Sequence, residues 1–423
     1  MAATPPPAVQ DSGTGRPGMA FREFVAFVAA VMATSALAVD AMLPGLPVMG
    51  QALGVVVDND RQWIVTVYLL GLGGAQIFYG TLADRFGRRP VLLAALAIYT
   101  AAAALSGLAG SMALMLPARA LQGVGAAGAR VLAIAIIRDR YAGRQMARVT
   151  SLAFLIFLAV PIAAPTLGQW ILGYAQWWAI FFVLGGFGAL VLLWTLLRLP
   201  ETLHEADRLP IDAARIAGAF LATVRDRQAV GYTLAFTLIV GSIFGYLNSA
   251  QQIFSDVFHA AAFFPTAFGL TALAMVASAL VNARIVGRFG MHRVSHSALL
   301  GFVAIAAVHV AFAWTGGDTL PVFMICQSVM FFCLGLIGPN FGALSMEPLG
   351  HIAGTASSVQ GFVTTVGGAL VGFAIGQRFD GSARPLTAGF FVFALVALAI
   401  VLVTERGRLF RQTHGAAAPP AVA

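Results

Sequence analysis

The chain contains no lysine, because all 25 of its basic residues are arginine. A Walker phosphate loop needs a lysine to reach the nucleotide phosphates, and a Schiff-base mechanism needs a lysine amine. Both are therefore excluded, which argues against ATP-driven transport by this chain. Cysteine is almost as scarce: Cys326 and Cys333 lie seven residues apart in one apolar run. On a helix that spacing puts them two turns apart, too far for a disulfide.

Charged residues are also rare, at 10% of the chain against 59% hydrophobic residues. So few charges cannot cover the surface of a water-soluble protein of 423 residues. The sequence has no His, Cys, Asp and Glu cluster with metal-ligand spacing and no nucleophile beside a base. We therefore predict an all-α polytopic membrane protein that is not an enzyme and needs neither a metal nor a cofactor.

Apolar runs of about 20 residues, the length a helix needs to cross a bilayer, occur twelve times in the chain. A polar stretch separates the first six from the last six. We expect a disordered cytoplasmic tail (1–21), a six-helix bundle (22–198), a cytoplasmic loop (199–228), a second six-helix bundle (229–405) and a cytoplasmic tail (406–423). The first run extends from Phe24 to Pro47, and the fourth from Met112 to Ile137.

The arginines indicate the orientation. Placing the N-terminus inside puts 20 arginines on the cytoplasmic side and three on the other, while Arg119 and Arg130 fall within the fourth run. The positive-inside rule therefore places both termini in the cytoplasm. The net charge of +8 is distributed over short loops, so we expect a lipid bilayer and no nucleic acid as the partner.

One polar loop has a partial copy. Gly80 to Pro90 reads GTLADRFGRRP, and Ala283 to Arg293 reads ARIVGRFGMHR 203 positions later. Each lies between two apolar runs, so the chain is predicted to consist of two related halves. Gly80 and Gly87 permit close approach and a tight turn. The remaining residues of this predicted cytoplasmic gate are Asp84, Arg85, Arg88, Arg89 and Asp139.

In this gate Asp84 is expected to cap a helix of the other half that begins near Gly354, and the arginines to pair with Asp139. Two interpretations stay open: an inner latch that closes in the outward-facing state, and a topology signal alone. In the second copy Gly287 stands where Asp84 does in the first, so the predicted latch is one-sided.

The loop at Gly80 to Pro90, RALQG at Arg119 to Gly123, and PETL at Pro200 to Leu203 together resemble the major facilitator superfamily of secondary transporters. The resemblance implies twelve transmembrane helices in two pseudo-symmetric six-helix halves. The segment from Val39 to Pro47 (VDAMLPGLP) is similar to the Bcr/CflA-type drug-resistance branch. The same similarity extends to Gly338-Pro339-Asn340, to Asn282 and Arg284, and to Ala353 through Ser358.

This branch implies proton-coupled efflux of small amphipathic drugs by a monomer in a bacterial-type inner membrane. A uniporter or symporter that imports a small metabolite remains the alternative, because the fold does not fix direction. Pro161, Pro165 and Gly168 in the fifth run resemble the antiporter motif. They are expected to bend that span, and in the functional interpretation the bend tightens the seal.

Asp40 is the one carboxylate well inside an apolar run, which makes it a functional candidate. A rise of about 1.5 Å per residue places Asp40 about 24 Å, and Arg119 about 28 Å, from the cytoplasmic face. If their helices face each other, Arg119 favours the ionised form of Asp40 while burial favours the neutral form. The pair is thus a candidate for proton coupling, with a static pair that fixes helix register as the alternative. Arg130 is expected either to line the inner cavity or to extend to the interface.

Polar side chains in mid-span are candidates for substrate binding, with interhelical hydrogen bonds as the alternative for each. With Arg130, they are Gln76, Gln122, Tyr246, Asn248, Gln251, Gln252, Gln327 and Asn340.

Overall fold

The computed structural model describes residues 19–210 and 213–410. Within these ranges twelve helices have 20 or more residues, and no residue is assigned to a strand. Eleven helical stretches of the described residues are long and apolar enough to cross a membrane. The remaining long helix, α6, has 32 residues and packs against α1. The predicted all-helical membrane fold is confirmed.

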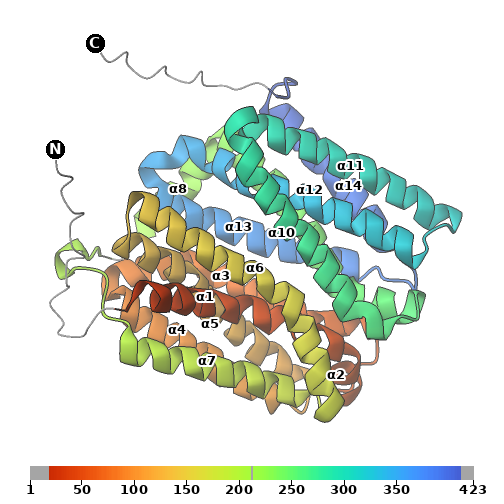
Figure 1. Ribbon diagram of the computed structural model, residues 1–423, viewed down its shortest axis with the longest axis horizontal. Helices are drawn as coiled ribbons and strands as arrows, with labels where there is room; N and C mark the ends of the chain where they lie inside the picture. Colours follow the sequence, from red (N-terminus) through yellow and green to blue (C-terminus); the bar gives the residue numbers. More distant parts are fainter. Residues whose placement is uncertain (1–18, 211–212, 411–423) are drawn as a thin grey trace.

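The first bundle contains six of the long helices (Figure 1). They are α1 (Phe21–Asp40), α3 (Trp63–Phe86), α4 (Arg88–Gly107), α5 (Met112–Arg140), α6 (Gly143–Tyr174) and α7 (Trp178–Arg198). The second bundle contains the other six: α9 (Arg227–Gln252), α10 (Phe264–Phe289), α11 (Met291–Thr315), α12 (Leu320–Met346), α13 (Ala353–Gly376) and α14 (Arg384–Thr404). The bundles meet along two seams, α3 against α13 and α6 against α10.

The two hairpins found in the sequence have the same backbone geometry. Gly87 separates α3 from α4 with φ 94°, and Gly290 separates α10 from α11 with φ 80°. Both glycines combine a positive φ with an extended ψ, a conformation almost restricted to glycine. We call the end of the protein that carries these two turns the hairpin end, and the other the opposite end.

The first predicted span is not one helix. α1 ends at Asp40, and the chain continues through the 3-10 turn η1 (Leu43–Gly45) and the short helix α2 (Leu46–Ala52). Pro44 and Pro47 account for the break, since proline lacks a backbone N–H and clashes with the preceding turn. Asp40 is therefore the last residue of a helix, not a mid-helix residue.

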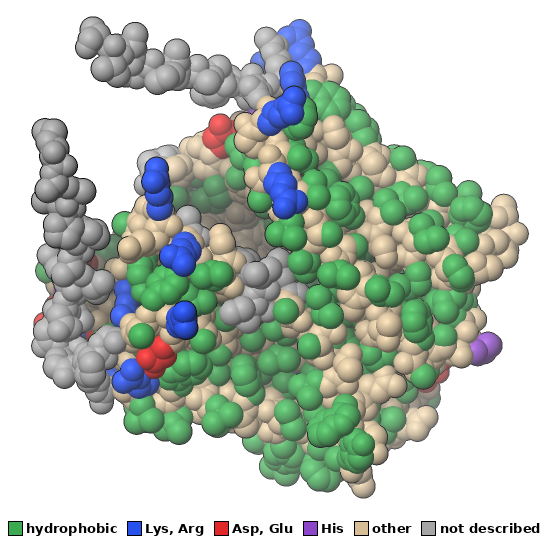
Figure 2. Space-filling view, viewed as in Figure 1, with side chains coloured by type: hydrophobic (Ala, Val, Ile, Leu, Met, Phe, Trp, Pro, Cys, Tyr) green, Lys and Arg blue, Asp and Glu red, His purple; other side chains and the backbone are tan. Residues whose placement is uncertain are grey.

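The central stretch, expected to be a loop, contains the helix α8 (Ala213–Arg225). Ala222 of α8 packs against a small apolar cluster of Ala229, Leu349 and Ala356, which ties the helix to the hairpin end of the second bundle. The outer face of the molecule carries many exposed apolar side chains (Figure 2), including Leu190 and Ile325. Such a surface is expected where the solvent is lipid.

Candidate functional site

A central cavity of about 220 Å³ lies where the two bundles meet. Most of its wall is apolar, and among the described residues Asp40 and Arg130 are the charged groups that line it. The other lining residues are Ser35, Ala36, Val39, Leu69, Leu72, Pro161, Ile243, Phe244, Leu247, Phe268, Thr271, Ala272, Met275, Phe331 and Thr365. Apart from Pro161 of the antiporter-like motif, no sequence pattern distinguishes these mostly apolar residues from ordinary core, so they could not be predicted as lining residues.

Asp40 projects into this cavity with only 6% of its surface exposed. Within residues 19–210 and 213–410 its carboxylate has no hydrogen-bond or ion-pair partner. An ionised carboxylate in an apolar site carries a large desolvation cost unless a counter-charge compensates it. The site therefore favours neutralisation of Asp40 by a proton or by a positive group of a ligand.

The expected pairing of Asp40 with Arg119 is wrong. Arg119 is fully buried and donates hydrogen bonds to the backbone carbonyls of Ile64 (3.2 Å) and Ala38 (3.0 Å) and to Gln122 Oε1 (2.6 Å). Its guanidinium also lies 4.5 Å from the ring centre of Tyr68. Arg119 does lie at the predicted depth, because its partner Ala38 is two residues from Asp40. Its guanidinium, however, donates hydrogen bonds to backbone carbonyls and not to Asp40. Arg119 thus holds α5 against α1 and α3.

Arg130, on the same helix, behaves differently. It lines the central cavity and also a second cavity of about 270 Å³ at the hairpin end. Its guanidinium has no hydrogen-bond or ion-pair partner in the part of the chain that the structure describes. Of the two expectations for this residue, lining of the inner cavity agrees with the structure.

The hairpin-end cavity carries more polar and charged side chains than the central cavity and opens to the surface, where Figure 2 shows a hollow flanked by arginine side chains. Arg88, Arg130 and Arg138 line it from the first bundle. Gly354, Ser357 and Ser358, all in the first turns of α13, line it from the second bundle. Gln76 borders the same cavity and donates a hydrogen bond to Thr365 of the second bundle (3.3 Å).

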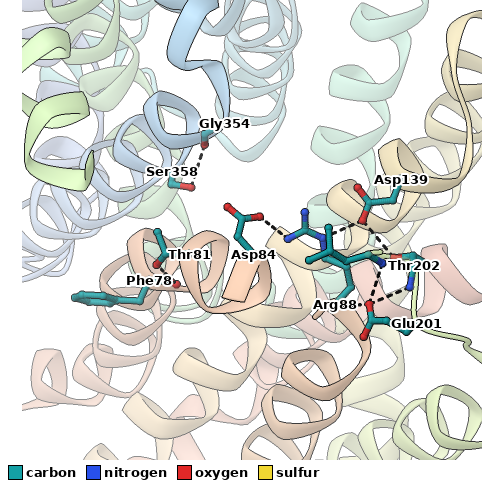
Figure 3. A network of polar contacts seen from close by, with 10 residues as sticks. Phe78, Thr81, Asp84, Arg88, Asp139, Glu201, Thr202, Gly354 and Ser358 are labelled. Atoms are coloured by element: carbon teal, nitrogen blue, oxygen red, sulfur yellow. Dashed lines mark hydrogen bonds and ion pairs between the residues drawn. The ribbon is translucent and has the colours of Figure 1, made fainter. Parts of the chain in front are cut away.

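Three of the predicted gate residues, Asp84, Arg88 and Asp139, form a network at the hairpin end (Figure 3). Arg88 bridges two carboxylates, with Nη1 2.7 Å from Asp84 and Nε 2.9 Å from Asp139. Asp84 borders the same cavity as Gly354 at the start of α13. The predicted pairing with Asp139 therefore applies to Arg88.

The other two gate arginines do not take that role: Arg89 donates to the carbonyl of Leu196 (3.0 Å), and Arg85 is exposed. Gly80 lies close to the second bundle, because an added Cβ would be 3.4 Å from Ser358 Oγ.

Glu201 has a structural role that was not predicted from the sequence. Its carboxylate accepts hydrogen bonds from the backbone N–H groups of Arg88 (2.8 Å) and Arg89 (3.2 Å), the first residues of α4. A carboxylate at a helix N-terminus accepts hydrogen bonds from backbone N–H groups that have no partner within the helix. Its negative charge also interacts favourably with the positive end of the helix dipole. The PETL motif that contains Glu201 was noticed, but its contact with a hairpin 113 residues away is not visible in sequence.

At the opposite end the two bundles are joined by four amide side chains, which we call the amide latch: Asn59, Gln62, Gln252 and Gln377. Seven hydrogen bonds cross between the bundles here. Gln62 Nε2 lies 2.7 Å from Gln252 Oε1, and Gln252 Nε2 lies 2.9 Å from Asn59 Oδ1. Beside them the rings of Trp63 and Phe373 are 4.1 Å apart. The bundles are therefore joined by direct hydrogen bonds at the opposite end, and at the hairpin end they border a cavity that reaches Arg130.

The predicted substrate-binding residues do not form one pocket. Gln252 belongs to the amide latch, Gln122 supports Arg119, and Asn340 donates to Asn282 (2.7 Å) within the second bundle. Gln251 borders another cavity, of about 410 Å³, toward the opposite end. The remaining three, Tyr246, Asn248 and Gln327, are buried in the second bundle.

The antiporter-like segment packs beside the carboxylate. α6 continues through Pro161 and Pro165, and Pro161 lines the central cavity. A Cβ added to Gly168 would come within 1.8 Å of the carbonyl oxygen of Ala41, the residue after Asp40. Only glycine allows α6 to approach the end of α1 so closely.

Comparison with known proteins agrees with this architecture. The family model described as Major Facilitator Superfamily matches residues 27–372. An uncharacterised transporter of this type from Bacillus subtilis, YdgK, is 29% identical over 85% of this chain and 90% of its own length.

Two further bacterial relatives are named for resistance. A bicyclomycin resistance protein homologue from Haemophilus influenzae is 26% identical over 87% of this chain and 92% of its own. The multidrug resistance protein MdtL of Klebsiella pneumoniae is 29% identical over 78% and 83%, respectively.

Among solved structures, the human organic anion transporter MFSD10 superposes with a TM-score of 0.61. It covers 90% of this chain and 100% of its own, at 19% identity, so this similarity concerns the fold alone. The match of the family model over most of the chain, with the two six-helix bundles and their repeated hairpins, shows that the chain belongs to the Major Facilitator Superfamily and is a transporter, not an enzyme.

Proposed function

We propose that the protein exports small amphipathic compounds in exchange for protons, by alternating access across a bacterial inner membrane. The observation that carries this proposal is the unpartnered carboxylate of Asp40 in an apolar cavity between the bundles. The names of the bacterial relatives, which refer to bicyclomycin and multidrug resistance, support export as the direction. The arginine-rich hairpin end is assigned to the cytoplasm by the positive-inside rule.

The proposed cycle uses the two ends in turn. In the present state the amide latch closes the opposite end, and substrate enters from the hairpin end. After the bundles rock to open the opposite end, an external proton neutralises Asp40 and releases the substrate. The bundles then return, and loss of the proton to the cytoplasm restores the charge that holds the next substrate. Proton and substrate compensate the same charge in turn, which is the physical basis of exchange.

A susceptibility assay tests this proposal. An efflux-deficient bacterium is transformed with the intact gene, with Asp40→Ala, or with Asp58→Ala, which alters an exposed acid outside the cavity. The intact protein and Asp58→Ala are expected to raise the inhibitory concentration of at least one amphipathic drug, and Asp40→Ala to raise none. Equal protection by Asp40→Ala at matched membrane levels contradicts the proposal.

A further inference from the structure

Two opposite charges line the central cavity, and neither has a hydrogen-bond or ion-pair partner among the described residues. Asp40 lies at the end of α1, and Arg130 lies on α5, ten residues before its C-terminal end at Arg140. Across residues 19–210 and 213–410 the two groups form no ion pair with each other or with a third residue. The remaining lining residues are uncharged. The cavity therefore presents a separated carboxylate and guanidinium on an otherwise apolar wall.

A ligand that carries a single charge can compensate only one of these two groups. A cation compensates Asp40 but adds a second positive charge near Arg130, and an anion has the converse problem at Asp40. Charge interactions beside an apolar wall are stronger than in bulk water, so an uncompensated group lowers affinity, and the cost is greater at the buried Asp40 than at the exposed Arg130. A zwitterion places a positive group on Asp40 and a negative group on Arg130 at the same time.

We propose that the substrates of this transporter are amphipathic zwitterions whose positive group binds Asp40 and whose carboxylate or equivalent anion binds Arg130. This inference rests on the proposed export function and deepens it. Arginine suits the second contact, because its planar fork donates two parallel hydrogen bonds to a carboxylate. The apolar part of the ligand packs on Phe244, Phe268 and Phe331 of the second bundle.

The route into the cavity agrees with an anionic group on the ligand. The hairpin-end cavity leads from the surface to Arg130, which lines both cavities, and Arg138 lies on the same wall two turns nearer the hairpin end. On the facing wall are the first turns of α13 with Ser357 and Ser358. A helix N-terminus attracts negative charge. The acid on this path, Asp84, already accepts a hydrogen bond from Arg88. A simple cation meets net repulsion here, and the anionic end of a zwitterion meets attraction.

The test compares compounds in matched threes that share one apolar body: a phenylalanine-containing peptide with free ends (zwitterion), its amide (cation) and its N-acetyl derivative (anion). The peptides are di- and tripeptides, because Arg130 lies eleven residues, or about 16 Å of helix rise, from Arg119 at the depth of Asp40, and the two charges of a single amino acid are too close together to reach both groups. Binding to the purified full-length protein in lipid nanodiscs is measured by equilibrium competition and ligand-induced thermal shift, without a proton gradient. We expect zwitterions to bind roughly tenfold or more tightly than either partner, the factor of one charge-assisted hydrogen bond.

Variants identify the source of this preference. Arg130→Gln should make each zwitterion bind no better than its amide, whereas Arg144→Gln, which alters an exposed arginine that lines neither cavity, should keep the difference. Arg130→Lys retains the positive charge and should retain most of the preference.

The inference is overturned if no zwitterion in any set binds more tightly than its cation and anion, or if Arg130→Gln leaves the preference intact. The zwitterion inference fails, and the proposed function stands, if singly charged cations are exported in exchange for protons as efficiently as zwitterions are. The proposed function fails instead if zwitterions bind as expected but none of them moves protons in vesicles.

Discussion

Arg119 and Arg130 show how differently two intramembrane arginines of one helix can act. Helical rise placed Arg119 at the depth of Asp40, and the structure agrees, but a sequence does not give the direction of a side chain. Arg119 is satisfied by two backbone carbonyls and a glutamine, so it stabilises the bundle, whereas Arg130 is free to meet a ligand. The sequence thus identified both residues, but Arg119 does not pair with Asp40, and among the described residues no ion pair joins Arg130 to Asp40 either.

A matched pair of substitutions separates these roles. Arg119→Lys keeps the charge but cannot donate in three directions, and it should lower the free energy of unfolding by roughly 2–4 kcal/mol. Arg130→Lys breaks no hydrogen bond or ion pair among the described residues and should leave thermal stability unchanged. Fluorescence-detected thermal unfolding in detergent measures both variants. Equal melting temperatures for Arg119→Lys and the wild-type protein argue against a structural role for Arg119.

Gly87 carries a second prediction at this scale. Its φ of 94° is costly for other residues, and an added Cβ would lie 2.4 Å from Glu201 Oε2, the oxygen that caps α4. Gly87→Ala should therefore destabilise the protein by about 1–3 kcal/mol or more. Gly54→Ala is the control, since Gly54 has a φ of 72° but no atom within 4 Å of the added Cβ. Thermal unfolding should show a larger loss of stability for Gly87→Ala than for Gly54→Ala. Equal losses would show that the contact with Glu201 does not contribute to the effect.

Among the elements, the residues just before α3 join the C-terminal ends of α9 and α13 and so hold the bundles together at the opposite end. Gln252 was a candidate in the sequence because it is a polar residue within an apolar run. Asn59 and Gln377 lie near the ends of apolar runs, where polar side chains are common and do not indicate a functional site. Their pairing depends on residues more than 300 positions apart, which periodicity cannot reveal. The latch is made of neutral amides, in contrast to the ion pairs of the hairpin end.

Loss of the latch should open the opposite end. Gln62→Leu removes three hydrogen bonds between the bundles, each worth about 1 kcal/mol. Electron-paramagnetic distance measurements between spin labels at positions 57 and 378 should show a larger population of long distances in this variant. Gln360→Leu removes a bond to Ser345 within the second bundle and should leave the distribution unchanged. An unaltered distribution in Gln62→Leu would show that other contacts hold the end closed.

For the whole molecule, hydropathy and turn residues sufficed for much of the fold. Twelve apolar runs and two Arg-Phe-Gly hairpins predicted the two-bundle architecture, because long apolar runs have few alternatives in lipid. The break after Asp40, the helix α8 and the conformational state were not predictable. They depend on local proline effects and on contacts between distant segments that leave no periodic trace.

The measurement that tests the central claim most directly is proton movement in proteoliposomes. Vesicles that contain the purified protein and a trapped pH-sensitive dye are exposed to a gradient of a transported compound. We predict counter-movement of protons with the wild-type protein and none with Asp40→Asn, although Asp40→Asn should stay folded because Asp40 has no protein partner among the described residues. Proton exchange by Asp40→Asn at the wild-type rate would contradict the account.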